Sequence, residues 1–302
     1  MPNPPHQANN PEITALPVTA SVEEVSNAIR RDIGLIIKNF LSLEDIKQIH
    51  REVGPHYGKT GSYNGTLFNA DDPPVSGLYG KSYTVAHKML NHPLYRDVAK
   101  ELLPRSTNVS SLRYPWKGET RRKCISNPVL ATSQAFSRKG PSAAQPLHRD
   151  DTPQHPIHPE GSSASSLLGL LVAGTLLVGS HVYGDDRPPV DPALCSTAEI
   201  DIGDAITIIG SIWHGAGEIK ANERRIIYSM HMTKGCYTSD ENQFLAIPWE
   251  IVEKYDPQLQ ALLGYTISQP NLNTVEQQDA TEVINNTEGV GLVSLAGTPV
   301  AI

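Results

Sequence analysis

The sequence predicts a mainly β domain, a sandwich or jelly roll, with helices on its flanks. Short apolar segments bounded by turn residues recur between about residues 109 and 233, amphipathic segments precede them, and helical patterns return after them. With 302 residues, the chain is long enough to bury one sizeable core. We expect a flexible N-terminal segment over 1–20, a single domain over 21–265 and a partly disordered tail over 266–302.

The flanking helices are predicted from their caps and from apolar residues at helical spacing. The first two follow Ser21 and Ser42, each with an acidic residue three positions later, as in a capping box. Between them, residues 35–37 predict a short buried strand. The expected helices cover residues 22–31, 43–53, 90–103, a segment opened by Pro248, and 257–263.

The β region is predicted from short apolar runs separated by turns. Strands are expected over 109–114, 128–137, 145–150, 166–172, 175–179, 198–202, 205–212 and 224–233. Residues 54–80, rich in Gly, Pro, Asp and Tyr, predict a surface loop or lid. The basic run Arg121-Arg122-Lys123 is expected in a solvated loop.

Composition excludes several classes of protein. The net charge of −7 offers no basic stripe to neutralise phosphates, which argues against nucleic-acid binding. Cys124, Cys195 and Cys236 are far apart, which is typical of a reducing compartment. No signal-peptide pattern occurs in residues 1–20, and the longest apolar stretch, 167–178, is too short to cross a bilayer. We therefore expect a soluble, cytoplasmic protein without a membrane partner.

The candidate catalytic residues begin with His148 and Asp150 in the segment 145–151. Two residues apart in an extended segment, they point to the same side. His214 follows 66 residues later, at the end of an apolar strand and before glycines that permit a tight turn. Two histidines and one carboxylate form a facial triad, the arrangement that holds Fe(II) and leaves positions open for a co-substrate and O2.

Arginines follow the second histidine at the start of the next strand. Arg224 and Arg225 stand 10 and 11 residues after His214, and one of them can point into the barrel, where a guanidinium binds a carboxylate in bidentate fashion. Iron and an inward arginine together predict a 2-oxoglutarate-dependent oxygenase, in which decarboxylation of 2-oxoglutarate to succinate generates the oxidant.

Other residues near the segment 145–151 could also bind a metal or line a substrate pocket. Asp151 competes with Asp150 as a ligand, but alternation favours Asp150. His155 and His158 are expected on a loop at the pocket entrance, and His181 in a turn. Four further residues are as well explained by a substrate pocket as by the core: Tyr79, Tyr83, Tyr228 and Met230.

Over roughly residues 22–275 the chain resembles the phytanoyl-CoA dioxygenase-like (PhyH) branch of the Fe(II)/2-oxoglutarate oxygenases, especially its fungal members from secondary metabolism. The matching blocks are residues 33–41, 145–151, 179–181, 203–204, 214–217, the Arg-Arg strand start, 247–250 and 262–265. The resemblance implies a double-stranded β-helix (cupin-like) core and often a homodimer. It also implies hydrophobic polycyclic substrates such as meroterpenoids or alkaloids, which are hydroxylated, desaturated or rearranged.

The resemblance implies a role for each site residue. His148, Asp150 and His214 would bind Fe(II), Arg224 rather than Arg225 would anchor 2-oxoglutarate, and Gln145 would contact the keto acid.

One departure concerns the connection between the strands at 166–172 and 175–179. Family members usually have about ten more residues there, whereas this chain continues directly through Ala173-Gly174, a candidate two-residue hairpin. The departure keeps a second function open, a non-catalytic or weakly active subunit of a heterodimer with a paralogous oxygenase. A third is a metal-dependent isomerase or hydrolase that does not use 2-oxoglutarate.

Overall fold

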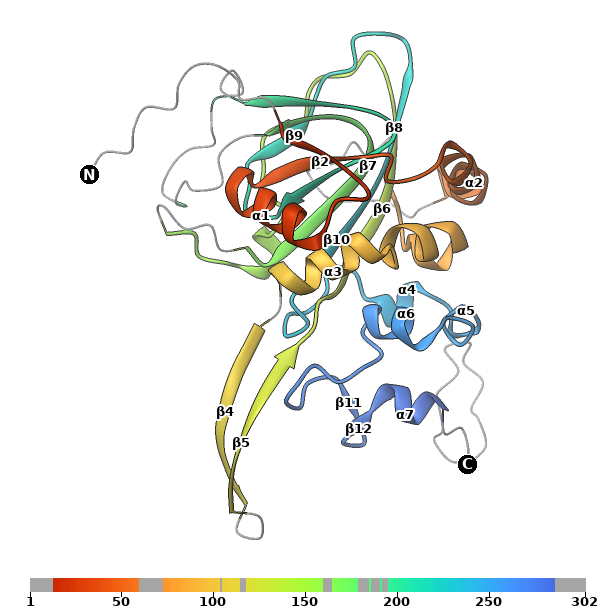
Figure 1. Cartoon of the computed structure of the whole chain (residues 1–302). Coiled ribbons are helices and arrows are strands. Elements are labelled where there is room, and N and C mark those ends of the chain that lie inside the picture. Colours follow the sequence, from red (N-terminus) through yellow and green to blue (C-terminus); the bar gives the residue numbers. More distant parts are fainter. Residues whose placement is uncertain are drawn as a thin grey trace, which may run out of the picture.

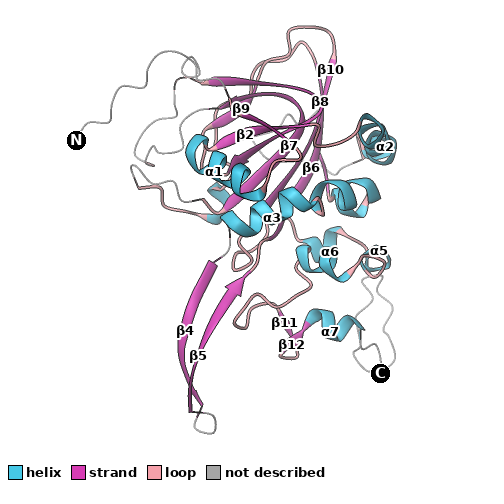
Figure 2. Ribbon diagram, viewed as in Figure 1, coloured by secondary structure: helices cyan, strands magenta, loops and turns pink. Residues whose placement is uncertain are grey.

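The computed structural model describes residues 13–59, 73–103, 105–114, 118–159, 165–178, 185, 191 and 195–285. Strands form the centre of the molecule, and helices pack beside and below them (Figures 1 and 2). The helical elements are α1 (Val22–Asp32), α2 (Leu43–Val53), η1 (Gly54–His56), η2 (Leu78–Gly80), the π-helix η3 (Val85–Leu90), α3 (Pro93–Leu102), η4 (Thr152–Gln154), α4 (Gln243–Ala246), α5 (Trp249–Val252), α6 (Pro257–Leu262) and α7 (Ala280–Asn285). The strands are β1 (Ala15–Pro17), β2 (Gly34–Lys38), β3 (Val75–Ser76), β4 (Arg105–Tyr114), β5 (Gly118–Ser126), β6 (Val129–Lys139), β7 (Leu167–Val178), β8 (Ser196–Ile209), β9 (His214–Ala216), β10 (Arg224–Thr233), β11 (Thr274–Val275) and β12 (Gln278–Asp279).

The central sheet has the strand order β1-β2-β8-β7-β10-β6-β3, and β9 pairs with β7 outside this path. The long strands β7 and β8 serve two layers. Residues 168–172 of β7 lie between β8 and β10, whereas residues 174–178 pair with the first part of β8, and 176–178 also with β9. Beyond β9, the segment carrying His148 is bridged to His214. A sheet whose long strands change partners in this way, so that two layers share them, forms a double-stranded β-helix, which confirms the predicted fold class.

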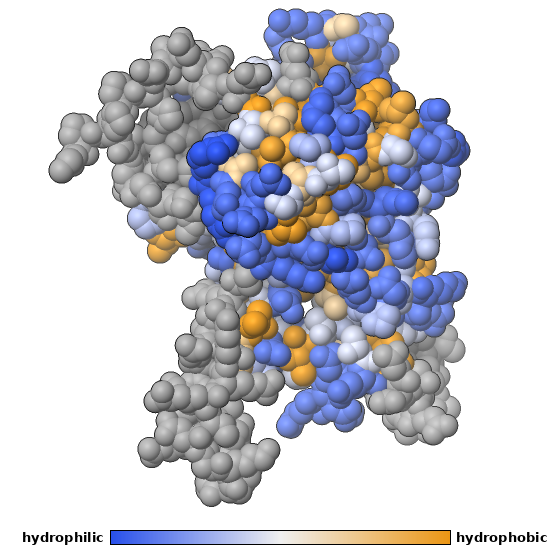
Figure 3. All heavy atoms as spheres, in the orientation of Figure 1, coloured by the Kyte–Doolittle hydropathy of each residue, from blue (hydrophilic) through white to orange (hydrophobic). Residues whose placement is uncertain are grey.

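The main core lies between the central sheet and the flanking helices. On β10, Tyr228, Met230 and Met232 face this core, and on β7 Leu168 and Leu170 do so, because alternate residues of a strand point to opposite faces. Helices α1 and α3 turn their apolar faces to the sheet. Their outer face is dominated by hydrophilic residues with hydrophobic ones scattered between them (Figure 3). The opposite face of the sheet is therefore left for the site.

Both helix caps predicted near the N-terminus are present. The Ser21 hydroxyl accepts a hydrogen bond from the Glu24 backbone N–H, and the Glu24 carboxylate accepts one from the Ser21 backbone, which completes a capping box. Ser42 caps α2 through its side chain, which accepts a hydrogen bond from the Asp45 N–H. The buried strand expected between these helices is β2, which pairs with β8.

Several predicted elements differ from the structure. The candidate hairpin at Ala173-Gly174 does not form: β7 runs through it, and a register shift between Val172 and Gly174 absorbs the change of partner. The two strands expected over 198–212 are likewise one strand, β8. Residues 145–150 form no strand beyond a single bridge at His148, because Pro146 cannot donate to a ladder.

The basic run Arg121-Arg122-Lys123 lies on β5 rather than in a loop, in a two-stranded hairpin with β4. This hairpin projects away from the central sheet (Figure 1). Residues 266–285 of the expected tail form β11, β12 and α7, while 286–302, like 1–12 and His181, lie outside the described residues. Among the described residues, no helix is both long and apolar enough to cross a membrane.

Candidate metal centre

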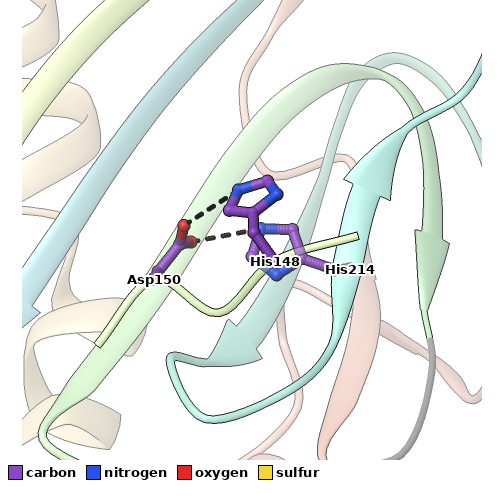
Figure 4. Close-up of side chains that lie close together, drawn as sticks. All are labelled: His148, Asp150 and His214. Atoms are coloured by element: carbon purple, nitrogen blue, oxygen red, sulfur yellow. Dashed lines mark ion pairs between the residues drawn. The ribbon is translucent and has the colours of Figure 1, made fainter. Parts of the chain in front are cut away.

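Three predicted ligands meet at one point of the structure. The Asp150 carboxylate faces two neighbouring imidazoles, with Oδ1 3.4 Å from His148 Nε2 and Oδ2 3.2 Å from His214 Nε2 (Figure 4). One ligand atom from each residue lies within 4.8 Å of the others, and this is the only such group found among the described residues. The expected alternative, Asp151, points away from the cluster and is fully buried elsewhere.

Backbone pairing explains why residues so far apart in sequence meet. The His148 N–H donates to the His214 carbonyl and the His214 N–H donates to the His148 carbonyl, each over 2.9 Å. A Cβ at Gly215 would stand 2.8 Å from the Gln145 carbonyl oxygen, so only glycine allows the two segments to approach this closely. The absence of a side chain at Gly215 thus allows β9 to pair closely with the 145–150 segment.

The outer nitrogens of both histidines are held by their own backbone. His148 Nδ1 lies 3.0 Å from the Pro146 carbonyl oxygen, and His214 Nδ1 lies 3.2 Å from that of Ile212. Carbonyl oxygens only accept, so each Nδ1 carries the proton in the neutral ring. Each Nε2 then presents its lone pair to the cluster, as a metal ligand requires.

A third histidine, which the sequence interpretation missed, contacts the same carboxylate. His231 on β10 has its Nε2 2.9 Å from Asp150 Oδ2. It fits because position 169 on neighbouring β7 is glycine: a Cβ there would lie 2.8 Å from His231 Nε2. His231 therefore donates to one oxygen of Asp150 and orients the carboxylate from behind.

The charges in this cluster are mutually stabilising. Burial would raise the pKa of Asp150, but His214, His231 and His148 together lower it well below its usual value. Burial likewise opposes protonation of His214 and His231, yet the facing Asp150 raises the pKa of each. The buried carboxylate and these two imidazoles thus each favour the charged form of the other.

The segment around Asp150 is fixed by a second set of polar side chains, all of them buried except Asp185. His158 Nε2 lies 3.1 Å from Asp151 Oδ2, its Nδ1 lies 2.8 Å from Asp185 Oδ1, and Arg149 Nη1 donates to the same Asp185 oxygen over 2.8 Å. The Arg149 guanidinium also lies over the Trp213 ring, beside His214. His158 is thus occupied by two carboxylates and is not among the residues that meet at the cluster. His155 lines a cavity beside the cluster.

A cavity of about 900 Å³ opens from the cluster, and alternate residues of β6 and β10 form part of its wall. Arg225 lines this cavity. Arg224 lies on the opposite face of β10, exposed, with Nη1 2.6 Å from the Ser137 hydroxyl. The expectation that Arg224 is the inward arginine is therefore wrong in orientation, since Arg225 shares its strand face with His231.

Gln145 lines the same cavity. Its Oε1 accepts a hydrogen bond of 3.2 Å from the Ala216 N–H on β9, which leaves the amide NH2 as the donor available to a ligand. Of the four residues that fitted either pocket or core, Tyr79, Tyr228 and Met230 are buried in the core and Tyr83 is exposed.

The residues present fit the metal and co-substrate implied by the motif. Two imidazole nitrogens and one carboxylate are the donor set of a non-haem Fe(II) site with open positions. The cavity beside them has space for further ligands, and Arg225 offers a cation to a carboxylate there.

Comparison with known proteins places the chain among fungal dioxygenases, although no family model matches it. It is 32% identical over 287 residues to the dioxygenase peniF of Penicillium patulum, covering 89% of this chain and 91% of the relative. It is 28% identical over 287 residues to the dioxygenase swnH1 of Arthroderma benhamiae, with the same coverage. A more distant likeness links it to the solved structure of the non-haem α-ketoglutarate-dependent epimerase SnoN, at 18% identity and a TM-score of 0.49 over 74% of this chain and 88% of SnoN.

The chain therefore belongs to this family of fungal dioxygenases, which are enzymes that use O2. His148, Asp150 and His214 are the residues of this chain that are suited to bind the iron of such an enzyme.

Proposed function

We propose that the protein is an Fe(II)- and 2-oxoglutarate-dependent oxygenase that oxidises a hydrophobic small molecule of secondary metabolism. The observation that carries this proposal is the meeting of His148, Asp150 and His214 at one end of a large cavity, with both Nε2 atoms free to bind a metal. Iron, when bound with 2-oxoglutarate and O2, supplies the oxidising chemistry while 2-oxoglutarate is decarboxylated to succinate.

The protein's own residues bind and orient. His148, Asp150 and His214 would hold the metal by one face, and His231 keeps the carboxylate in place through Oδ2. Arg225 would bind the distal carboxylate of 2-oxoglutarate as a charge-assisted pair, and the Gln145 amide would donate to the keto acid. This assignment replaces Arg224, whose guanidinium is held at Ser137.

The substrate would occupy the rest of the cavity. Its volume lies within the range of roughly 300–1,000 Å³ that is usual for small-molecule sites. Apolar side chains such as Phe136, Leu171 and Ile227 line it beside polar ones. Such a lining excludes water and suits a largely hydrophobic compound of meroterpenoid or alkaloid size.

The test uses 2-oxoglutarate itself as the probe. Under anaerobic conditions we expect the full-length protein to bind one Fe(II), and then 2-oxoglutarate only when the metal is present. Admission of O2 should release succinate. His148→Ala should abolish Fe(II) binding, whereas His155→Ala, which removes a histidine from the same cavity, should retain it.

A second pair of variants tests the co-substrate anchor. Arg225→Gln should weaken 2-oxoglutarate binding by about 10- to 100-fold, as expected for loss of a charged hydrogen bond. Arg224→Gln should bind it normally. Succinate formation by His148→Ala at the wild-type rate, or metal-independent binding of 2-oxoglutarate, would contradict the proposed function.

A further inference from the structure

The wall of the cavity formed by β6 and β10 is built from directly opposed residue pairs. Odd-numbered residues of β10 and even-numbered residues of β6 face the cavity, because the two strands are antiparallel neighbours in a fixed register. Along this wall a charged pair is followed by an apolar pair, a polar pair, and a pair that contains the histidine in contact with Asp150. The four pairs are Arg225 with Arg138, Ile227 with Phe136, Ser229 with Gln134, and His231 with Thr132.

The first of these pairs places two cations opposite each other. Like charges directly across an antiparallel ladder destabilise a sheet, and a guanidinium does not lose its charge at physiological pH. Both side chains are partly buried and line the cavity. Among the described residues, neither guanidinium forms a hydrogen bond or ion pair with a carboxylate.

The surroundings do not neutralise this pair. Burial and the neighbouring Arg138 lower the pKa of Arg225, and only Glu223, exposed at the strand start, opposes them. Arg224 and Lys139, the next pair in the ladder, add further positive charge. An anion between the two guanidiniums would remove this repulsion.

We infer that Arg138 is a second anchor for 2-oxoglutarate, which binds its distal carboxylate between Arg138 and Arg225. This inference rests on the proposed function and adds a residue to it. Two guanidinium forks can donate to both oxygens of one carboxylate, and the Ile227–Phe136 pair beside them limits access of water. Arg138 would thereby help to select 2-oxo acids that carry a distal carboxylate over those that lack one.

The test compares two keto acids on the metal-loaded protein. The first is 2-oxoglutarate, and the second is 2-oxopentanoate, which has the same carbon chain without the distal carboxylate. Anaerobic calorimetry with Fe(II) gives the dissociation constants for the wild type, Arg138→Gln, Arg138→Lys and the control Lys139→Gln. Lys139 is adjacent on the same strand but exposed, so its substitution removes one charge without changing the cavity wall.

We expect Arg138→Gln to bind 2-oxoglutarate about 10- to 100-fold more weakly and to bind 2-oxopentanoate as the wild type does. Arg138→Lys should recover part of the loss, and Lys139→Gln should show none. Thermal unfolding supplies a second measurement: without ligand, Arg138→Gln should melt no lower than the wild type, because a repulsion is removed. In turnover, the variant should need more 2-oxoglutarate for the same saturated rate.

Two results would overturn the inference while leaving the proposed function intact. One is that Arg138→Gln binds 2-oxoglutarate as tightly as the wild type does, while Arg225→Gln binds it more weakly. This result would also be obtained if Arg138 bound a carboxylate of the substrate instead. The other is an equal loss of affinity for both keto acids, which would indicate general damage to the site. A wild-type protein that binds no 2-oxoglutarate in the presence of Fe(II) would overturn both proposals.

Discussion

The two ends of the β6–β10 wall handle charge in opposite ways. At the His231 end, the Asp150 carboxylate meets three imidazoles within 3.4 Å. At the other end, Arg138 and Arg225 face each other, and among the described residues no carboxylate forms a hydrogen bond or ion pair with either of them. One end is already balanced by the protein, whereas the other is balanced only when an anion arrives.

This difference shows how a site can be prepared for two kinds of ligand. The metal ligands are held in place before binding, so little conformational freedom is lost when a metal arrives. The arginine end keeps an unfavourable interaction in the free protein that the co-substrate relieves. Substitutions at the two ends should therefore affect metal and co-substrate separately.

The largest expected effect comes from breaking the balanced end. Asp150→Ala removes the carboxylate shared by His148, His214 and His231, and should reduce Fe(II) affinity by more than the roughly 10- to 100-fold typical for residues that only surround metal ligands. Metal titration under anaerobic conditions measures this. Asp240→Asn, a carboxylate change in the same cavity, should leave metal binding intact, and equal affinities of the two variants would refute the assignment.

A smaller loss should follow from removing the support behind the carboxylate. His231→Leu deletes the donor to Asp150 Oδ2 and should weaken Fe(II) binding by about 10- to 100-fold. His231→Gln, which keeps a donor, should restore part of it. The affinity for 2-oxoglutarate at saturating metal should change little, and a selective loss of that affinity instead would show that the two ends are not separable.

The contacts of Asp150 with His214 and His231 should also make the stability of the metal-free protein depend on pH. Folding raises the pKa of His214 and His231 above 6.5 because each faces Asp150. The folded state then binds protons more tightly than the unfolded state, so this stabilisation is complete below pH 6.5 and is lost as pH rises through the raised values. Denaturant unfolding between pH 6 and 9 should show the decline, and Asp150→Ala should show less of it.

The smallest effect is expected from a substitution outside the cavity, at Arg224, and it concerns the free energy of unfolding. Arg224→Gln removes an exposed contact with Ser137 and should change the free energy of unfolding by no more than about 0.5 kcal/mol. Chemical denaturation measures this change. A large destabilisation would mean that the outer face of β10 contributes more than its exposure indicates.

The parts of the site that sequence could predict are those that lie in local patterns. His148 and Asp150 are two residues apart, and His214 stands at the end of an apolar strand before glycines. Arg225 could not be separated from Arg224, because strand alternation gives the inward residue only once pairing with β6 and β7 fixes the register. The apolar strand around His231 does not mark this histidine as a site residue. Its spacing of six residues from Arg225 does, because residues an even number apart on a strand point to the same face.

The fold shows the same limit. The capped helices α1 and α2 depend on neighbouring residues, and their predictions are confirmed. Turn chemistry predicts a hairpin at Ala173-Gly174. In the structure, however, β8 pairs with β7 both before and after these residues, and β9 pairs with the end of β7, which favours a continuous strand with a register shift. The choice between a hairpin and a continuous strand thus depends on pairing with strands that are distant in sequence, which a local pattern does not contain.

The continuity of β7 has a consequence for how the protein opens. Because β7 pairs with β9 along one part of its length and with β10 along the other, the ladder that holds His214 cannot separate without disturbing the ladder that faces the core. The amides of β7, β8 and β9 should therefore exchange with solvent hydrogen as one cooperative unit, at a free energy close to that of global unfolding. The metal ligand on β9 would then be among the last parts of the molecule to lose its place, although it lies at the edge of a cavity.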